Sequence, residues 1–179
     1  MVDDAHLKTI VTACQAGSEK AFSEFVDMYA TRCYGYFYRA TGNSAVSNDL
    51  LSELFMKLVV KIGSFKGGSF EKWLFTVASN IFRDYLRRQY RQKKLLQSKA
   101  DDLAILPTAK GVDTEISDQL QIQLAKLDPD IAELIVLRFY GQLSFKELAA
   151  MRSEPIGTTL SKVHRGLKKL RELMGTGDG

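Results

Sequence analysis

The sequence predicts an all-α protein: two small helical modules joined by a flexible linker, the second ending in a helix-turn-helix. Apolar residues recur every three or four positions through most of the 179 residues, which is the period of an amphipathic helix. No credible strand is found, and only three prolines interrupt the chain. Periodicity weakens at 97–112, which contains Pro107 and Gly111, so we expect a first module at 1–96 and a second at 113–179.

Three helices are expected in the first module. Ser18 is placed to cap a helix whose apolar positions run to Phe37, and Gly42-Asn43-Ser44 ends it. The second helix has its apolar stripe at Val46, Leu50, Leu54, Leu58 and Ile62. A loop at 63–69 with paired glycines then precedes a long helix, from near Ser69 to about Leu96, that buries Phe70, Leu74, Val77 and Ile81.

Four shorter helices are expected in the second module. The first covers 113–126, and Pro129 opens the next, which Gly141 ends. Ser144 and Glu147 have the S-x-x-E spacing of a capping box, which begins a short helix to about Met151. After a turn holding Pro155 and Gly157, the inward positions of the last helix are Thr159, Val163, Leu167, Leu170 and Met174.

Charge is distributed unevenly along the chain, although the net charge is only +4. Residues 1–64 have a net charge of −1, residues 65–99 of +7, residues 100–137 of −6 and residues 138–179 of +4. Clustered cations repel one another, so they either face solvent or meet a polyanion. The acidic stretch is therefore a candidate shield for the two basic segments.

Signals for enzymes, metals and membranes are weak. Cys14 and Cys33 form no C-x-x-C, and His6 and His164 lie at no metal-ligand spacing from them, so we expect no metal and no cofactor. The chain has no glycine-rich phosphate loop and no G-x-S-x-G, so no catalytic residues are expected. The N-terminus is acidic without an apolar stretch behind it, and no segment approaches the ~20 apolar residues of a membrane span. A reduced, cytoplasmic protein is expected.

The last helix has the pattern of a DNA-reading helix. Opposite its inward stripe lie hydroxyl and cationic side chains at Thr158, Ser161, Lys162, Arg165, Lys168 and Lys169. Cations bind phosphates, while such side chains near the N-terminal turns reach base edges in the major groove. A lysine-rich surface helix with no nucleic-acid role is the alternative interpretation of this segment alone.

The upstream basic segment differs because aromatic residues alternate with its cations. Trp73 and Tyr85 lie at the border of the buried stripe, and the polar flank holds Asn80, Arg83, Arg87 and Arg88. Aromatic rings beside cations suit unpaired nucleic acid, where stacking contributes about 1–3 kcal/mol per base. Most of these rings are individually better explained as core residues, so the segment by itself is only suggestive.

Four stretches resemble one family. Residues 70–88 are similar to the F-x-x-W-L-x-x-I-A-x-N-x-x-x-D-x-x-R-R stretch in region 2 of extracytoplasmic-function sigma factors, and Asp49 to Phe55 resembles the D-L-x-Q-E-x-F of the same region. Residues 155–165 resemble the P-x-G-T-V-K-S-R-L-H-R of region 4, and 127–140 resemble the segment before it. The resemblance covers roughly 20–92 and 115–174, in the family's order.

The resemblance implies a transcription initiation factor that binds core RNA polymerase, through the β′ clamp and the β flap, and directs it to promoters. It implies −35 contacts from Thr158, Ser161, Lys162, Arg165, Lys168 and Lys169. It implies −10 contacts and melting by Lys66, Phe70, Trp73, Asn80, Arg83, Arg87 and Arg88, with a flipped base capped by the loop at 64–69. Asp49 and Glu53 would meet the polymerase, and an anti-sigma factor is a further expected partner.

Four residues depart from the family pattern. Ser52 replaces the usual glutamine, Glu154 stands in the turn where an apolar residue is frequent, Leu160 replaces a lysine, and Lys162 replaces an arginine. Lys162 lacks the bidentate fork that suits guanine, so the −35 sequence is not predicted. Two other functions fit the sequence less well. A stand-alone helix-turn-helix regulator leaves the aromatic and basic helix unexplained, and an enzyme has no support beyond the spacing of Asp49 and Glu53.

Overall fold

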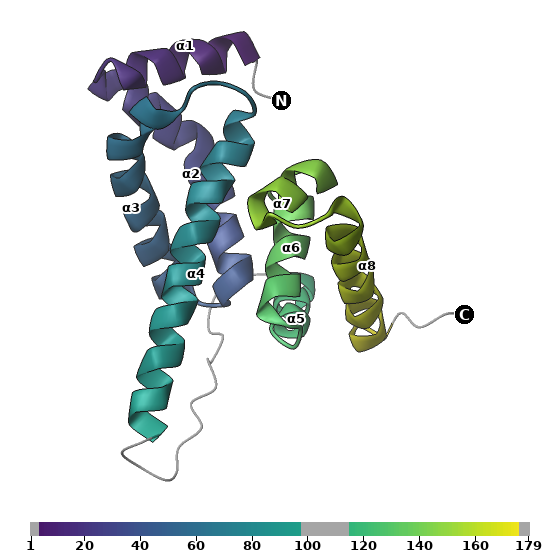
Figure 1. Ribbon diagram of the computed structural model, residues 1–179. Coiled ribbons are helices and arrows are strands. Elements are labelled where there is room, and N and C mark those ends of the chain that lie inside the picture. The colour runs from purple at the N-terminus through teal and green to yellow at the C-terminus, as the bar shows by residue number, and fades with distance from the viewer. Residues whose placement is uncertain (1–3, 98–114, 176–179) are drawn as a thin grey trace.

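The computed structural model describes residues 4–97 and 115–175, and this part of the chain is helical, as predicted. All but the first residue of the predicted linker lies outside the described residues. Figure 1 shows the helices, whose bounds in chain order are α1 Asp4–Gln15, α2 Glu19–Thr41, α3 Ser44–Lys61, the short 3₁₀ turn η1 Ile62–Ser64, α4 Phe70–Gln97, α5 Glu115–Leu124, α6 Pro129–Phe139, α7 Phe145–Arg152 and α8 Ile156–Leu173.

Helix ends follow the local capping signals. The Ser18 side chain accepts a hydrogen bond from the Ala21 backbone N–H at the start of α2. Gly42, with φ of +66°, ends that helix in the left-handed conformation that glycine tolerates best. Both halves of the Ser144 and Glu147 capping box are present at α7, as predicted. Short sequence motifs therefore fix both ends of α2 and the start of α7.

Helix α1 was not predicted from the sequence. Its buried residues are Leu7, Ile10, Val11 and Cys14, which have the spacing of one helical face. They pack with the core residues of α2, the helix that α1 contacts most. The apolar spacing that indicates this helix is present in the sequence.

An aromatic cluster forms the core of the first module, α1–α4. The Phe25 ring meets the Phe70 ring edge to face, with centroids 5.6 Å apart, and lies 5.1 Å from the Tyr29 ring. Further along α2, the Tyr36 ring meets Phe75 of α4 in the same manner at 5.6 Å. Helices α2 and α4 are thus held together along their length by rings.

The second module, α5–α8, packs α8 closely on α6. A Cβ atom at Gly166 would lie only 2.4 Å from Cγ2 of Ile131, so the two helices approach each other where α8 has no side chain. Leu134, Leu148 and Val163 fill the space among α6, α7 and α8. This packing fixes which face of α8 turns outward.

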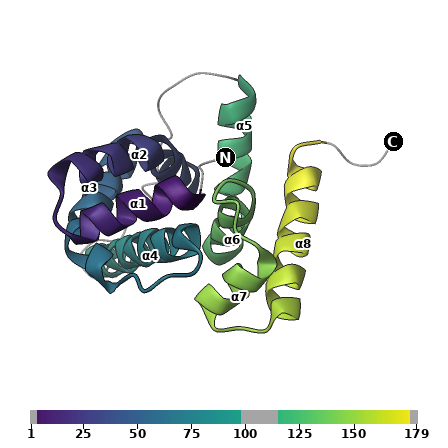
Figure 2. The same ribbon diagram turned by 90° about the horizontal axis from the view of Figure 1, so that it is seen from above.

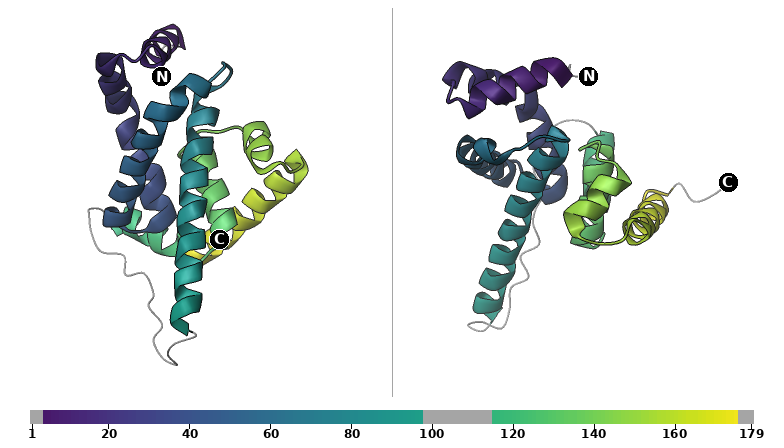
Figure 3. Two further views of the ribbon diagram at one scale, coloured as in Figure 1. Left: turned by 60° about the vertical axis from the view of Figure 1, so that its left-hand side comes forward. Right: turned by 45° about the horizontal axis from the view of Figure 1, so that its top comes forward.

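The two modules lie side by side, with α6 between the first module and α8 (Figures 2 and 3). Gly35 of α2 makes the approach possible, because a Cβ there would lie 2.0 Å from the Tyr140 hydroxyl. The Arg39 guanidinium lies over the Tyr140 ring, 4.7 Å from its centroid. None of the helices described for residues 4–97 and 115–175 is long and apolar enough to cross a membrane.

Candidate nucleic-acid interface

The outer face of α8 is polar, cationic and open to solvent. Thr158, Ser161, Arg165, Lys168 and Lys169 are exposed, while Thr159, Val163, Gly166 and Leu170 on the opposite face are buried. The short helix α7 and the turn at 153–155 precede α8, as in a helix-turn-helix. Glu172, in the last turn, is the helix's single acidic residue, so its first four turns present no negative charge. Such a face suits a DNA groove.

Lys162 is the exception on α8, because its ammonium group is bound by carboxylates. Its Nζ atom lies 2.7 Å from Glu154 and 3.3 Å from Asp130, and its side chain is 26% exposed. The hydrogen bond to Glu154 raises the pKa of Lys162. Glu154 also accepts a hydrogen bond from the buried Thr159 hydroxyl at 2.7 Å. The unusual glutamate of the turn therefore anchors the start of α8 and draws Lys162 away from the outer face.

Leu160 faces outward, as its helical phase predicts. Its side chain and that of Ile156 in the first turn of α8 remain exposed. The two therefore place an apolar surface beside Thr158 and Ser161. An apolar side chain at this position suits the methyl group of a thymine.

Helix α4 holds the residues expected at melted DNA, but in several environments. Asn80, Arg87 and Arg88 are exposed. The Arg87 guanidinium pairs with Asp84 at 2.8 Å on the same helix, and that of Arg88 pairs with Glu53 of α3 at 3.3 Å. Cations of α4 thus face solvent while carboxylates partly neutralise them.

Two aromatic residues of the predicted −10 set pack inside the protein. Phe70 is 4% exposed and belongs to the aromatic core, so in this conformation its ring contacts protein only. Trp73 is half-buried, with its ring 5.6 Å from that of Phe65 and 5.5 Å from that of Phe70. Lys66 is exposed in the loop that follows η1, where Gly67 and Gly68 both have positive φ. The rings of Phe70 and Trp73 lie beside this loop and support it.

Arg83 lies between the modules and not on the open flank of α4. Its guanidinium is 3.3 Å from Asp130 and 3.4 Å from Glu133, both on α6. Burial raises the pKa of Glu133, although the Ser79 and Tyr36 hydroxyls donate hydrogen bonds to it and Arg83 lies close. One of the cations expected at the −10 element is therefore bound by the second module.

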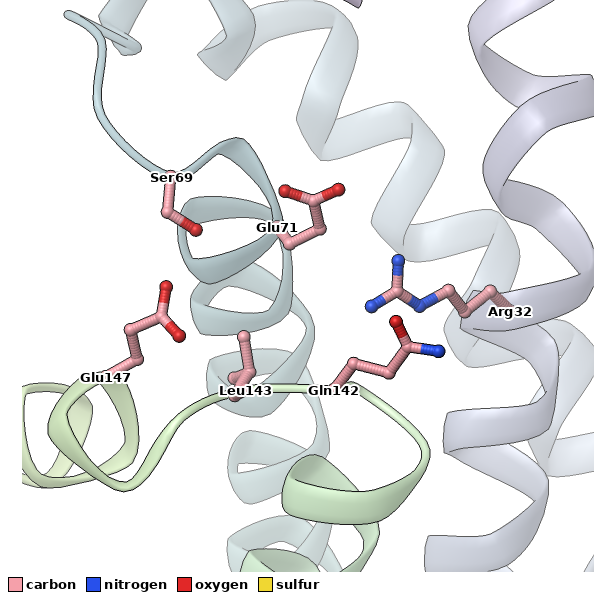
Figure 4. A pocket seen from close by; sticks show the side chains of 6 residues that line it. All are labelled: Arg32, Ser69, Glu71, Gln142, Leu143 and Glu147. Atoms are coloured by element: carbon pink, nitrogen blue, oxygen red, sulfur yellow. The ribbon is translucent and has the colours of Figure 1, made fainter. Parts of the chain in front are cut away.

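A small polar pocket marks the same junction near the start of α4 (Figure 4). Its volume is about 130 Å³, and both modules line it with Arg32, Ser69, Glu71, Gln142, Leu143 and Glu147. The Arg32 guanidinium donates a hydrogen bond to the Gly141 carbonyl at 2.5 Å and lies over the Phe75 ring. The pocket adjoins Ser69, the last residue of the loop expected to hold a flipped base.

The expected polymerase residues on α3 differ in their surroundings. Asp49 is exposed, whereas Glu53 pairs with Lys57 at 2.7 Å and with Arg88. Burial opposes ionisation of Glu53, but the hydrogen bonds from Lys57 and Arg88 outweigh it and lower the pKa of Glu53. Sequence reasoning missed an apolar surface on the same helix, where Met56, Val59 and Val60 are all more than half exposed.

No group of histidine, cysteine, aspartate and glutamate suited to a metal ion occurs among residues 4–97 and 115–175. Cys14 and Cys33 are free and buried, and burial raises the pKa of Cys33 to about 12. Both thiols therefore behave as core residues.

Comparison with known proteins identifies the two modules. The model of Sigma-70 region 2 matches residues 25–92, and that of Sigma-70, region 4 matches residues 123–172. The RNA polymerase sigma factor CarQ of Myxococcus xanthus is 34% identical over 161 residues, which cover 89% of this chain and 92% of CarQ. The chain belongs to the sigma-70 family. It is an extracytoplasmic-function sigma factor that directs RNA polymerase to promoters and catalyses no reaction itself.

Other relatives match this sigma factor over most of their length. The ECF RNA polymerase sigma factor SigW of Bacillus subtilis is 28% identical over 178 residues, covering 93% of this chain and 95% of SigW. The sigma factor RpoE from Bartonella quintana, solved in complex with the anti-sigma factor NepR, is 26% identical. The superposition has a TM-score of 0.70 and covers 87% of this chain and 98% of RpoE, so it spans both regions.

The contacts between the two regions of the sigma factor were missed by sequence reasoning at the level of residues. Glu133 and Arg152 were not among the predicted site residues, although their side chains form an ion pair at the junction. The available signal was the acidic stretch, which includes Asp128, Asp130 and Glu133 and was expected to shield the basic segments. Its described part does meet cations of both modules.

Proposed function

We propose that α8 reads the −35 element of the promoter with its outer face. The observation that carries this is the sorting of side chains on α8: Thr158, Ser161, Arg165, Lys168 and Lys169 are all exposed on one face, and the opposite face is buried against α6 and α7. Thr158, Ser161 and Arg165 lie in the N-terminal half, which reaches base edges, and Lys168 and Lys169 contact phosphates. Lys162 joins them once it leaves Glu154 and Asp130.

Region 2 supplies the −10 contacts. Asn80, Arg87 and Arg88 line the exposed flank of α4, and Lys66 extends from the loop that holds the flipped base. Trp73 and Phe70 support that loop, and Arg83 joins the DNA surface once the modules separate. Flipping a base costs a few kcal/mol of unstacking, so a preformed loop with cations around it lowers the barrier to melting.

Protein partners use other surfaces. Asp49 and the exposed apolar residues of α3 face the β′ clamp of core polymerase, with Glu53 held beneath them by Lys57 and Arg88. The second module contacts the β flap. An anti-sigma factor is a further partner, because the packed regions superpose on RpoE, which was solved with its anti-sigma factor NepR.

The test of −35 reading is a selection experiment with holoenzyme. Core polymerase is loaded with the wild-type chain, Arg165→Ala or the control Lys20→Ala, which removes an exposed cation from α2. Each holoenzyme then enriches fragments from a randomised duplex library. Loss of one arginine that contacts a base costs about 1–3 kcal/mol, or roughly fivefold to 150-fold.

Wild type and Lys20→Ala are expected to enrich a two-part motif, whereas Arg165→Ala should lose the upstream part and keep the downstream part. An Arg165→Ala holoenzyme that selects the same upstream motif with the same affinity would contradict the proposal. A variant that no longer binds core polymerase would contradict the assignment of separate roles to the two modules.

A further inference from the structure

Two carboxylates of α6, Asp130 and Glu133, contact both modules at once. They lie three residues apart, on the side of α6 that faces α4 and α7. Their partners include Arg83 from the first module and Arg152 and Lys162 from the second. The acidic pair is therefore the point at which cations from α4, α7 and α8 converge.

Glu133 is the buried member of the pair, with 2% of its surface exposed. Its Oε1 atom accepts hydrogen bonds from the Tyr36 hydroxyl at 2.8 Å and the Ser79 hydroxyl at 2.5 Å, both in the first module. Its Oε2 atom accepts from Arg152 at 2.6 Å and from Arg83 at 3.4 Å. A buried carboxylate needs such partners, and here the first module supplies most of them.

Asp130 joins the two proposed DNA surfaces directly. One oxygen lies 2.7 Å from Arg152 and 3.3 Å from Arg83, and the other lies 3.3 Å from Lys162. Arg83 belongs to the proposed −10 surface and Lys162 to the proposed −35 surface. A single carboxylate thus holds one cation of each.

Pairing within the second module accounts for only part of the arrangement. Arg152, itself only 4% exposed, binds both carboxylates, and Lys162 divides its contacts between Asp130 and Glu154. The remaining partners lie across the module boundary: the Tyr36 and Ser79 hydroxyls and the Arg83 guanidinium. The side-chain amide of Gln121 adds a further contact there, because it donates to the Arg39 carbonyl at 2.9 Å.

We propose that Asp130 and Glu133 form an intramolecular docking site that binds Arg83 in place of a promoter phosphate, so that the modules must separate before the −10 surface is complete. This inference rests on the proposed function for the role of Arg83. Carboxylates and phosphates offer a guanidinium the same charge and the same paired oxygens, so the two compete for Arg83. If only a fraction of the molecules is open, affinity for DNA is reduced by that fraction.

The first test removes the two charges without changing side-chain size, in Asp130→Asn/Glu133→Gln. The matched control, Glu19→Gln/Asp27→Asn, changes net charge equally at exposed positions of α2. Small-angle scattering measures compaction, for which a single compact body of this length has a radius of gyration of about 16 Å. Titration with a 30-base-pair duplex of random sequence then measures phosphate binding as a function of salt.

The docking site predicts that Asp130→Asn/Glu133→Gln has a larger radius of gyration than the control. It also predicts roughly tenfold tighter duplex binding at low salt, with a salt slope steeper by about 0.9 for the one phosphate contact that Arg83 adds. Compaction or duplex binding equal to that of the control would overturn the inference.

A second variant opens the junction without altering charge. Gly35→Leu places a side chain where a Cβ would already lie 2.0 Å from the Tyr140 hydroxyl, and Ala45→Leu, at an exposed position of α3, is its control. Gly35→Leu should expand the protein and tighten duplex binding as well. Expansion without tighter binding, or continued compaction, would overturn the competition between carboxylates and phosphates.

These measurements use DNA of random sequence, so they do not depend on promoter recognition. Failure of Arg165→Ala to alter the selected motif would contradict the proposed −35 function alone. The radius of gyration and the salt slope of duplex binding test whether the docking site exists.

Discussion

Helices α4 and α8 are both amphipathic, with cations on the polar side, but they have different neighbours. Each buries an apolar stripe and presents cations on the other side. On α4, carboxylates bind Arg83, Arg87 and Arg88. On α8, Lys162 is bound in this way, whereas no ion pair of Arg165, Lys168 or Lys169 occurs among the described residues.

The comparison shows that a count of cations does not measure an available DNA surface. Residues 65–99 have the larger net charge, +7 against +4 for residues 138–179, yet the cations of α8 are the less neutralised. An arginine that already has a carboxylate partner gains less from a phosphate. The proposed DNA surface of region 4 is thus largely unpaired, whereas the proposed surface of region 2 is complete only after its carboxylate partners are exchanged.

The largest effect is expected where the pairing is buried. Glu133→Ala removes one of the two carboxylates that bind the buried Arg152 guanidinium and also the acceptor of the Tyr36 and Ser79 hydroxyls, which costs about 3–5 kcal/mol in the free energy of unfolding. Urea denaturation of the full chain measures this. Glu53→Ala is the comparison on the exposed side, because its pairs with Lys57 and Arg88 contribute at most about 1 kcal/mol. Equal losses in the two variants would contradict the distinction.

A smaller effect is expected at Asn80, which is exposed on α4. Asn80→Ala should weaken open-complex formation by roughly tenfold, because a hydrogen bond to an unpaired base contributes about 1–1.5 kcal/mol. Permanganate reactivity of −10 thymines measures melting, and footprinting of the upstream element serves as the internal control. Reduced protection of the −35 element would place Asn80 on the wrong surface.

Salt dependence separates free from paired cations. Lys168→Ala on α8 should reduce the salt slope of duplex binding by about 0.9, the value for one phosphate contact. Arg87→Ala on α4 should reduce it less, because Asp84 already lies 2.8 Å from the guanidinium. Titrations with random-sequence duplex at several salt concentrations give both slopes, and a larger reduction for Arg87→Ala would reverse the comparison.

The smallest expected effect is a pH dependence at Glu154. Burial opposes its ionisation, but hydrogen bonds from Lys162 and Thr159 hold the pKa of Glu154 below the ordinary 4.5. Its stabilisation is therefore complete above about pH 4.5 and is lost as pH falls through the lower folded-state pKa. Melting temperatures of wild type and Glu154→Gln should differ at pH 6 and converge in acid. A difference in melting temperature that grows in acid would contradict the predicted direction of the pH dependence.

Local signals predicted the fold better than they predicted the site. Ser18, Gly42 and the Ser144–Glu147 box act over three or four residues, so the sequence shows them directly. The burial of Phe70 was predicted from its place on the apolar stripe, but the rings that it meets, those of Phe25 and Tyr29, belong to another helix and were not predicted. On the outer face of α8, the helical phase alone predicts which side chains are exposed, and only Lys162 departs from that prediction.

The junction between modules could not be predicted residue by residue. Arg83 and Glu133 are 50 positions apart, and no periodicity connects them. The alternation of acidic and basic segments indicated that shielding was possible, but it did not show which carboxylate meets which cation. Pairing of this kind depends on how α6 lies against α2 and α4.

The most direct test of the docked arrangement is a distance distribution in the free protein. Spin labels are attached at Lys20→Cys in α2 and Glu172→Cys in α8, both exposed, while burial raises the pKa of the native thiols Cys14 and Cys33 and keeps them unreactive. Pulsed EPR should give one narrow distribution for the otherwise wild-type chain and a longer, broader one after Asp130→Asn/Glu133→Gln. A broad distribution that is the same in both proteins would contradict docking through α6.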